Sequence, residues 1–436
     1  MALIFGARDA IPSAILIAYP FRSAIIPSMS AQTTGTLSFE DARHLVEDHA
    51  SKLRPQGKER VELLDAPGRI LAEAIDADRN FPPFARAARD GYAVQAADLA
   101  QVPARLSVIG EIKAGVRLDT LPRLESGQTA SIMTGAPCPP GSDAVVMAEY
   151  TSSEGSQVEI TKGVSAGDNI VPSASEARRG ERLLSPGARI DHAAVAVAAS
   201  VGRTHLLVHD QPRVAVLSTG DEVVDVDAHP GTHQIRNSNT YSLAAQIQAA
   251  GGEPVLLPVA PDQAGRLHEL ISDGLEADLL LIAGGVSMGK YDLVEQVLAE
   301  LGAEFFFTGA QIQPGRPVVF GKVQGKYFFG LPGNPVSTMV TFELFVRPLL
   351  DAMAGMTPQK LVFLSAKLKT EIKTRTGLKR FVPAILSGEF ENAAVELAPW
   401  LGSGDIAAAA RANCYVVIPP DRDRIAAGEW VPVLMR

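Results

Sequence analysis

The stretch Asp278–Asp292 combines residue types that could bind an anion and position a cation. It reads DLLLIAGGVSMGKYD, so a short apolar run is followed by Gly284, Gly285, Ser287 and Asp292. Glycine lets backbone N–H groups approach an anion closely, and an aspartate carboxylate can ligate a divalent cation. The same pattern is also typical of an ordinary tight turn with a solvated aspartate, and this stretch alone does not separate the two interpretations.

The apolar run before these residues predicts the element that positions them. Leu279–Ile282 has the length and uninterrupted apolarity of a strand buried on both faces. The segments on either side have helical patterns, which is typical of a parallel α/β sheet. Ligands bind such sheets beyond the carboxyl ends of the strands. We therefore expect the glycines and Asp292 to lie at that edge.

Two further segments end in the same way, which predicts that three strand ends face one crevice. Val214–Leu217 leads into STGDE, and Tyr327–Phe329 leads into GLPGNPVS. A helix that begins near Val336 would direct its N-terminal N–H groups into the crevice, where a phosphate or another oxyanion could bind. The carboxylates of Asp221 and Glu222 would lie at the same rim, which indicates a divalent cation beside the phosphates.

Length, composition and charge limit the classes of protein that fit. The chain has 436 residues, 20% charged and 46% hydrophobic, which indicates a globular protein of about two to four units. Its net charge of −9 argues against non-specific nucleic-acid binding. Cys138 and Cys414 are too few for a disulfide framework or a cysteine-rich zinc site, and a reducing cytoplasm fits. The histidines show no metal-ligand spacing and form no Ser-His-Asp or Cys-His pattern.

Residues 1–36 are expected to be a disordered leader, or Met1 is an upstream start codon and Met29 the true start. Their short apolar patches are broken by Pro12 and by charged residues, so they match a secretory signal poorly. No apolar span in the chain reaches the roughly 18 residues of a transmembrane helix, and we expect no membrane partner.

Glycine, proline and the changing periodicity divide the remaining chain into four units. Ser38 and Asp41 predict the N-terminus of a first helix. We expect a discontinuous N-terminal subdomain, which the family resemblance described below implies to be elongated, an inserted β-rich subdomain, an α/β domain and a C-terminal β-barrel or sandwich. Their expected bounds are 37–76 with 167–207, then 77–166, 208–355 and 356–436.

Together the motifs resemble one known family. STGDE, AGGVSMGKYD, QPGRPVVFGK and GLPGNPVS, in this order and spacing, are similar to those of the MoeA family, which includes the E domain of gephyrin. The resemblance runs from about Leu37 to the C-terminus and includes DGYAV at 90–94 and TGAPCPPGSDAVVM at 134–147. It implies a multidomain fold of the α/β plus β class. The α/β domain would be molybdopterin-binding-like, with an N-terminal mixed region, an inserted β-rich subdomain and a C-terminal β-barrel.

The family comprises molybdopterin molybdenumtransferases, so the resemblance implies an enzyme that uses adenylyl-molybdopterin and molybdate. The products would be molybdenum cofactor and AMP, with Mg²⁺ as cofactor. The resemblance also implies a cytoplasmic homodimer whose site is completed across subunits. Candidate partners are molybdopterin adenylyltransferase and molybdoenzyme apoproteins or their chaperones. Two alternatives stay open: a molybdopterin adenylyltransferase, against which the flanking subdomains argue, and a non-catalytic molybdopterin-binding or scaffold paralogue.

The resemblance also implies roles for individual residues. The catalytic residues would be Asp90, Glu222 and Asp292, and the metal ligands Asp221, Glu222 and Asp292. Asp90 would reach the crevice of the other subunit, although Asp90 and Thr134 are also typical of turns. The expected substrate-binding residues are Thr134, Thr219, Gly220, Asn237, Gly284, Gly285, Ser287, Arg316, Pro332, Gly333, Asn334, Ser337 and Ser403. Arg316 and Lys322 would offset the charge of the oxyanion.

The chain departs from the family pattern before Asp90. Family members have DNSAM there, whereas residues 85–89 read ARAAR, so Arg86 or Arg89 could contact a phosphate or molybdate or could be solvated loop charges. In an ungapped alignment, Glu176 takes the place of the aspartate in a family GED motif.

Three more departures affect expected ligands in the α/β and C-terminal units. Asn237 stands where many members have aspartate, and Gln313 stands where others have lysine. Pro383 replaces an arginine, so Lys379 or Arg380 would have to substitute for it or molybdate is held differently.

Overall fold

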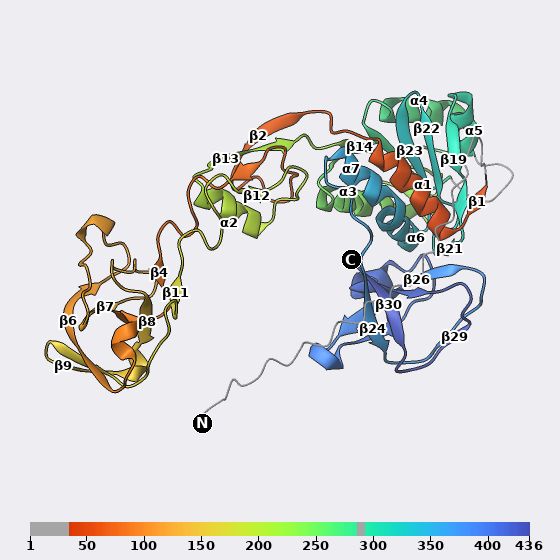
Figure 1. Ribbon diagram of the computed structural model, residues 1–436. Coiled ribbons are helices and arrows are strands. Elements are labelled where there is room, and N and C mark those ends of the chain that lie inside the picture. Colours follow the sequence, from red (N-terminus) through yellow and green to blue (C-terminus); the bar gives the residue numbers. More distant parts are fainter. Residues whose placement is uncertain (1–34, 286–292) are drawn as a thin grey trace, which may run out of the picture.

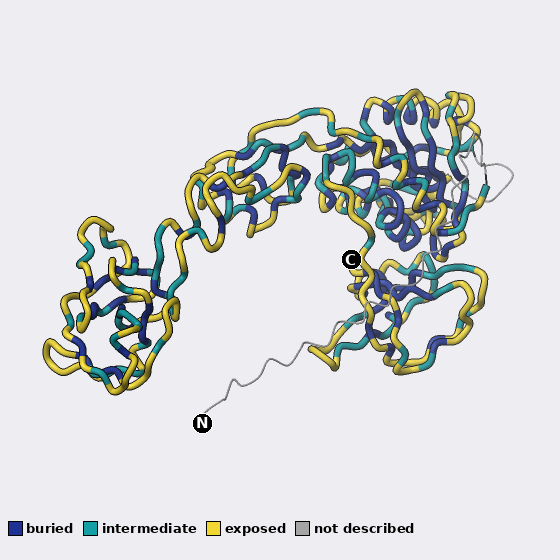
Figure 2. The backbone as a smooth tube through the Cα atoms, viewed as in Figure 1, coloured by how far each residue is buried: buried dark blue, intermediate teal, exposed yellow. Residues whose placement is uncertain are grey.

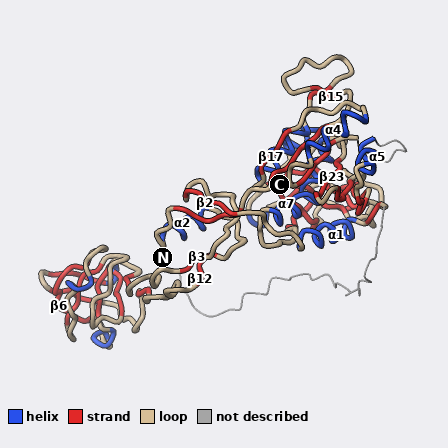
Figure 3. Tube along the Cα trace, turned by 90° about the horizontal axis from the view of Figure 1, so that it is seen from above, coloured by secondary structure: helices blue, strands red, loops and turns tan. Residues whose placement is uncertain are grey.

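The computed structural model describes residues 35–285 and 293–436. Its four units form an extended, bent molecule (Figure 1), with the inserted sheet at the far end from the α/β domain and the C-terminal barrel beside the α/β domain. The view from above shows the same separation (Figure 3). None of the described helices combines the length and apolarity needed to cross a membrane. The expected leader, apart from its last two residues, lies outside the described residues.

The α/β domain contains a six-stranded sheet in the order β17-β14-β18-β23-β22-β19. The first four strands are parallel, and β22 is antiparallel to both of its neighbours. The strand bounds are β14 Arg213–Ser218, β17 Glu253–Leu256, β18 Leu279–Ala283, β19 Glu304–Phe307, β22 Val319–Val323 and β23 Lys326–Leu331. The predicted parallel sheet and its three neighbouring strand ends are confirmed.

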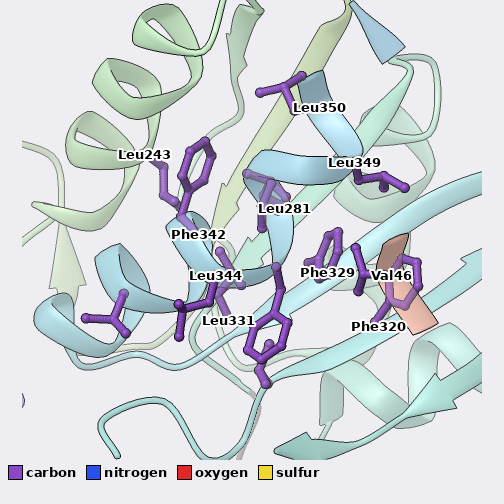
Figure 4. Close-up of a cluster of buried hydrophobic side chains, with 14 of the residues drawn as sticks. Val46, Leu243, Leu281, Phe320, Phe329, Leu331, Phe342, Leu344, Leu349 and Leu350 are labelled. Carbon is purple, nitrogen blue, oxygen red and sulfur yellow. The ribbon is translucent and has the colours of Figure 1, made fainter. Parts of the chain in front are cut away.

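Helices cover both faces of this sheet, which is why β18 is apolar throughout and buried at every residue. On one face lie α3 and α6–α7, and on the other lie α4 and α5. Side chains of β14 alternate accordingly, with Val216 in one core and Leu217 in the other. Figure 4 shows part of the first core, where Phe329 is fully buried. The helix bounds are α3 Asn239–Ala249, α4 Ala264–Gly274, α5 Leu293–Glu300, α6 Pro335–Thr341 and α7 Arg347–Met353, with a π-turn at Phe342–Val346.

Helix α1 (Phe39–Ser51) packs against the α/β domain, unlike the expectation that residues 37–76 form one subdomain with 167–207. Its N-terminus is capped as predicted, since the Ser38 hydroxyl accepts a hydrogen bond from the Asp41 N–H (3.0 Å). Its apolar face includes Val46, which belongs to the same core as Phe329 and helix α7. That apolar stripe is explained by burial against α7. Strand β1 (Thr36–Leu37) pairs with β20 (Gly309–Ala310) of the same domain.

The elongated N-terminal subdomain is built from chain segments on both sides of the inserted sheet. Strand β2 (Lys58–Glu62) pairs with β13 (His205–His209), and β3 (Ile75–Asp76) pairs with β12 (Arg182–Leu184). Helix α2 (His192–Ser200) covers them, and their buried side chains form a separate core (Figure 2). From β2 onwards, the two segments therefore pack together as expected, while the exact bounds stay a prediction.

The inserted unit is a six-stranded sheet in the order β8-β5-β7-β6-β10-β9, as its β-like sequence predicted. It is connected to the N-terminal subdomain through the pair β4 (Arg86–Ala87) and β11 (Ile170–Val171). The strand bounds are β5 Gly91–Val94, β6 Ala104–Ile112, β7 Gln128–Ile132, β8 Ala144–Met147, β9 Thr151–Glu154 and β10 Gln157–Ile160. Short 3₁₀ turns lie at Ala96–Leu99, Leu118–Thr120 and Ala148–Tyr150.

The C-terminal unit is a closed barrel, so the barrel alternative is correct. Strands β26, β27, β24, β30 and β28 follow one another around it, and pairing of β28 with β26 closes the ring. The short strand β21 extends it from the α/β domain. The bounds are β21 Ile312–Gln313, β24 Phe363–Leu368, β25 Ile372–Lys373, β26 Lys379–Ser387, β27 Ala394–Leu397, α8 Ile406–Arg411, β28 Cys414–Ile418, β29 Arg424–Ile425 and β30 Trp430–Met435, with a 3₁₀ turn at Phe390–Asn392.

Candidate active site

A cavity of about 590 Å³ opens at the carboxyl ends of β14, β18 and β23. Eight residues predicted from the motifs line it: Thr219, Gly220, Glu222, Asn237, Gly284, Gly285, Gly333 and Asn334. The three strands bring them together because they end level with one another, with Ser218 beside Ala283 and Ala283 beside Leu331. The predicted residues Ser287 and Asp292 lie outside the described residues.

The glycines of the cavity let the loops that follow β14, β18 and β23 pass close to one another. Gly284 has φ +97°, and a Cβ there would lie 2.8 Å from the Thr219 carbonyl oxygen. The N–H groups of Thr219, Gly220 and Gly284 donate to the carbonyls of Ala283, Ala260 and Leu331. These three N–H groups are therefore occupied, contrary to the expectation that the glycine loops offer them to an anion. In the described part of the chain, the N–H groups of Gly333 and Asn334 donate to no backbone carbonyl.

Helix α6 begins at Pro335, as predicted, but its first two residues offer no N–H group to an anion. Pro335 has no N–H group, and the N–H of Val336 donates to the Ser403 carbonyl (3.0 Å). Ser337 is buried at 3% exposure and does not line the cavity. The Val336 N–H is therefore occupied, and phosphate binding at this helix N-terminus stays a prediction for the neighbouring N–H groups. The sequence could not show that the barrel supplies an acceptor there.

A buried polar network supports the cavity floor. The Asn237 side-chain oxygen accepts from the Thr240 N–H (3.1 Å) and the Ser218 hydroxyl (3.2 Å), and its amide nitrogen donates to the Thr240 hydroxyl (2.9 Å). Asn237 therefore helps to cap helix α3, a role in which asparagine and aspartate are equivalent. The neighbouring Asn239 donates to the Gly333 carbonyl (2.8 Å) and so holds the turn before α6 against α3.

Three carboxylates lie near one another at the rim. Glu222 and Asp262 line the cavity, and the Asp221 carboxylate accepts a hydrogen bond from the Asp262 N–H (3.0 Å). Burial raises the pKa of Asp262, and the negative charges of Asp221 and Glu222 raise it further. Among the described residues, no three histidine, cysteine, aspartate or glutamate side chains are arranged to hold a metal ion.

Several predicted ligands do not line the cavity. Arg316 is exposed, and its carbonyl accepts from the Ala310 N–H. Lys322 has its ammonium 5.0 Å from the centroid of the Tyr327 ring. Pro332 contributes its carbonyl to the Thr338 hydroxyl, and Ser403 lies one residue before the lining residue Gly404.

The predicted ligands between the α/β domain and the barrel also make contacts outside the cavity. Gln313 lies in β21 opposite Arg380, and Pro383 lies inside β26. Lys379 forms an ion pair with Glu40, and Arg380 donates to the Leu378 carbonyl (3.2 Å). Neither cation lines the cavity, so the structure does not bring a substitute for the family arginine to it.

Asp90 and Thr134 meet at the surface of the inserted unit. One Asp90 carboxylate oxygen accepts from both the N–H (2.7 Å) and the hydroxyl (2.9 Å) of Thr134. Both hydrogen bonds lower the pKa of Asp90, and the bond from the Thr134 N–H has the larger effect. No described residue of this unit lines the cavity of its own chain. Asp90 and Thr134 thus lie together at one end of the molecule, far from the α/β domain that carries the cavity (Figure 1).

The basic residues before Asp90 differ in their surroundings. Arg86 forms an ion pair with Glu176 (2.9 Å), the residue at the place of the family's motif aspartate. This pair links strand β4 to the segment that follows β11 (Ile170–Val171). Arg89 is exposed and forms no ion pair with a described residue. The interpretation of Arg86 as an anion ligand loses support, because its guanidinium already has a carboxylate partner.

Eleven lining residues were not selected from the sequence: Ser218, Val223, Ile235, Arg236, Ser238, Asn239, Asp262, Ala283, Pro335, Gly404 and Ile406. Asp262 had a usable signal, because VAPD follows the fourth parallel strand β17 just as STGDE follows β14. Arg236 and Asn239 flank the Asn237 that was selected. Gly404 and Ile406 come from the barrel, and only the family resemblance, through the neighbouring Ser403, indicated that this loop reaches the cavity.

Comparisons with known proteins agree with this arrangement. Residues 37–202 match the family model of the MoeA N-terminal region (domain I and II), residues 215–352 a probable molybdopterin binding domain, and residues 365–435 the MoeA C-terminal region (domain IV). The chain is 34% identical over 412 residues to a molybdopterin molybdenumtransferase from Nostoc sp., which covers 91% of this chain and 93% of that relative. It is 33% identical to the enzyme of the same name from Haemophilus influenzae, with 87% and 94% covered.

Solved structures show the same likeness. A molybdopterin biosynthesis MoeA protein from Pyrococcus horikoshii OT3 is similar with a TM-score of 0.74 and 29% identity, over 92% of this chain and 100% of that chain. A second structure of the MoeA protein from that organism has a TM-score of 0.68 and 32% identity, over 92% and 99%. The family predicted from the motifs is thereby confirmed. Because its relatives match it over nearly their whole length at more than 30% identity, the chain belongs to the MoeA family.

Proposed function

We propose that the protein is a molybdopterin molybdenumtransferase, which inserts molybdenum into adenylyl-molybdopterin and releases molybdenum cofactor and AMP. The observation that carries this proposal is the cavity at the three strand ends, which is lined by eight of the motif residues. It lies within the segment that matches a probable molybdopterin binding domain. The curated relatives from Nostoc sp. and Haemophilus influenzae are named for this transfer activity.

The cavity has groups suited to a phosphorylated, heteroaromatic substrate. Gly333 and Asn334 offer backbone N–H groups to phosphate oxygens, and a substrate donor could pair with Glu222. Ile235 and Ile406 add apolar surface against which a flat ring can pack. We assign Gly284 and Gly285 a role in keeping the cavity open, because the absence of a side chain lets their loop pass close to Thr219.

Mg²⁺ is part of the proposal because the rim concentrates hard oxygen ligands. The Asp262 N–H donates to the Asp221 carboxylate (3.0 Å), and both Asp262 and Glu222 line the cavity, so three carboxylates lie close together at the rim. The described carboxylates fit Mg²⁺ only in a site completed by phosphate oxygens and water, which is its usual mode of binding. Asp221, Glu222 and Asp262 would then hold the ion, which polarises the phosphoanhydride when bound. Asp292 keeps its predicted role as a further carboxylate.

A second copy of the chain would complete the site. Asp90 and Thr134 form a preorganised acceptor–donor pair that lies far from the cavity of the same chain (Figure 1). In a homodimer the inserted unit of one protomer can approach the cavity of its partner. This proposal accounts for an exposed carboxylate that is held in one orientation yet faces no cavity of its own. The absence of cysteine-rich motifs is compatible with a cytoplasmic enzyme.

Product analysis tests the proposed function. The purified protein is incubated with adenylyl-molybdopterin and Mg²⁺, with and without molybdate, and AMP is quantified. We expect AMP release that depends on molybdate. Adenylylation of molybdopterin from ATP would indicate an adenylyltransferase instead, and substrate binding without AMP release would indicate a scaffold. Either result would contradict the proposal.

A further inference from the structure

The cavity has an unusual charge balance for a site that takes polyanions. Its described lining contains two carboxylates, Glu222 and Asp262, and a single cationic side chain, Arg236. A third carboxylate, that of Asp221, accepts a hydrogen bond from the Asp262 N–H (3.0 Å), so the negative charge at the rim opposes an incoming anion. A phosphate or oxyanion that binds here needs a compensating positive charge.

The backbone on both sides of Arg236 is held in place. Strand β16 (Ile235–Arg236) pairs in parallel with β15 (Val223–Val224), and the long loop between them projects from the α/β domain (Figure 3). The N–H of Ile235 donates to the Glu222 carbonyl and that of Asn237 to the Val224 carbonyl, both at 2.8 Å. Arg236 therefore has a fixed position relative to the rim carboxylate Glu222.

The guanidinium of Arg236 is only partly engaged. Its Nε donates to the Ala228 carbonyl (3.0 Å), which restrains the plane of the group. Within the described part of the chain, its two terminal amino groups have no hydrogen-bond or ion-pair partner. A guanidinium held through Nε presents a fork that matches two oxygens of a tetrahedral oxyanion.

The cations predicted from the sequence do not compete for this role. Arg316 and Lys322 lie outside the lining, and Lys379 is paired with Glu40. We propose that Arg236 is the anion-binding side chain of the cavity and holds a tetrahedral oxyanion of the substrate through its terminal amino groups. The inference deepens the proposed function on which it rests, because it names the ligand that offsets the substrate charge. The oxyanion is either the phosphate of the adenylyl group or molybdate.

Titration calorimetry of the full chain with AMP and, separately, with sodium molybdate tests the proposal. We expect Arg236→Gln to weaken binding of at least one anion by roughly tenfold or more, because a charge-assisted contact is lost. Arg236→Lys should weaken it less, since it keeps the charge and loses the fork. Loss confined to AMP identifies the phosphate, and loss confined to molybdate identifies that oxyanion. Added salt should weaken binding to the wild type more than to Arg236→Gln.

Two further variants serve as comparisons. Arg266→Gln removes the same charge from α4, where Arg266 pairs with Glu269 outside the cavity, and should bind both anions as the wild type does. Arg316→Gln tests the competing cation. The proposal is overturned if Arg236→Gln binds both anions normally, if Arg316→Gln or Arg266→Gln causes the larger loss, or if the wild type binds neither anion. Arg236-dependent binding without molybdate-dependent AMP release would leave the inference standing and refute the proposed function.

Discussion

The cavity of the α/β domain and the Asp90–Thr134 surface of the inserted unit present functional groups in opposite ways. The cavity arises where three parallel strands end level, and its loops are fixed by mutual backbone hydrogen bonds. Asp90 lies on an exposed surface and is fixed by one neighbouring residue, Thr134. The α/β domain has a cavity whose described lining includes a single cationic side chain. The inserted unit has an oriented carboxylate, that of Asp90, which lines no cavity of its own chain.

This difference explains why the two regions depend on different parts of the fold. The shape of the cavity depends on glycine at crossing points such as Gly284, where any side chain meets the backbone of Thr219. The Asp90 surface needs only the ends of the neighbouring strands β5 and β7 and two hydrogen bonds. Substitutions at the glycine crossing should therefore lower stability strongly, whereas substitutions at Asp90 should act mainly on the chemistry and change stability only slightly.

The largest effect on rate is expected for Glu222→Gln. The change keeps the shape of a side chain that lines the cavity and removes its charge. Loss of such an electrostatic contact typically lowers the rate by about a hundredfold. The melting temperature should hardly change, because Glu222 is exposed. Molybdate-dependent AMP release and a thermal melt measure both quantities, and a wild-type rate would remove Glu222 from the catalytic set.

A smaller loss is expected for Asp90→Asn. It removes a charged contact that we place at the partner's cavity, which corresponds to roughly a tenfold or greater loss of rate. The matched variant Asp98→Asn changes a surface aspartate of the same unit, which accepts from Ser126 (2.6 Å), and should keep full activity. Equal losses in both variants would argue for a general effect on the inserted unit.

Gly284→Ala should lower stability more than Gly302→Ala. Both glycines have positive φ, +97° and +82°, so each alanine carries a conformational cost of about 1–2 kcal/mol. Only at Gly284 does the added Cβ meet backbone, at 2.8 Å, which adds about 1–3 kcal/mol of overlap. Denaturant unfolding of the α/β domain measures the difference. Equal destabilisation of the two variants would show that the loop crossing can relax.

The smallest effects concern pH, and their signs should differ between the two regions. The pKa of Asp262 is raised by burial and neighbouring carboxylates, so its charged form destabilises the fold, and this cost fades as pH falls through the folded pKa. Hydrogen bonds from Thr134 lower the pKa of Asp90, so its charged form stabilises the fold above the unfolded pKa, and this contribution is lost as pH falls through the folded pKa.

At neutral pH, Asp262→Asn should therefore melt above the wild type and Asp90→Asn below it. Both differences should shrink when the melts are repeated in acid. The same sign of shift for both variants would show that the two carboxylates do not have the contrasting surroundings described above.

The sequence was sufficient for the features that depend on local pattern. Apolar runs such as Leu279–Ile282 predicted strands buried on both faces, and the small and polar residues after them predicted a common edge. Ser38 and Asp41 predicted the capped start of α1. These predictions succeed because strand burial and capping are set by neighbouring residues.

Features that depend on distant segments were predicted poorly. Helix α1 belongs to the α/β core because its apolar stripe fits α7, which periodicity alone cannot show. The Val336 N–H is occupied by the Ser403 carbonyl, which lies 67 residues further along the chain and comes from the barrel. Arg236 was overlooked in favour of Arg316, since the sequence does not tell which of two exposed arginines faces the crevice. Asp292 keeps its assignment from the sequence alone.

The central claim is that the cavity of one protomer and the Asp90 surface of its partner form one site. Differently tagged Glu222→Gln and Asp90→Asn chains can be mixed, and the heterodimers isolated by sequential affinity steps. Each heterodimer would contain one site with both residues intact, so AMP release should recover to about half of the wild-type rate per dimer. A rate from verified heterodimers that does not exceed those of the two parent variants would contradict the shared site.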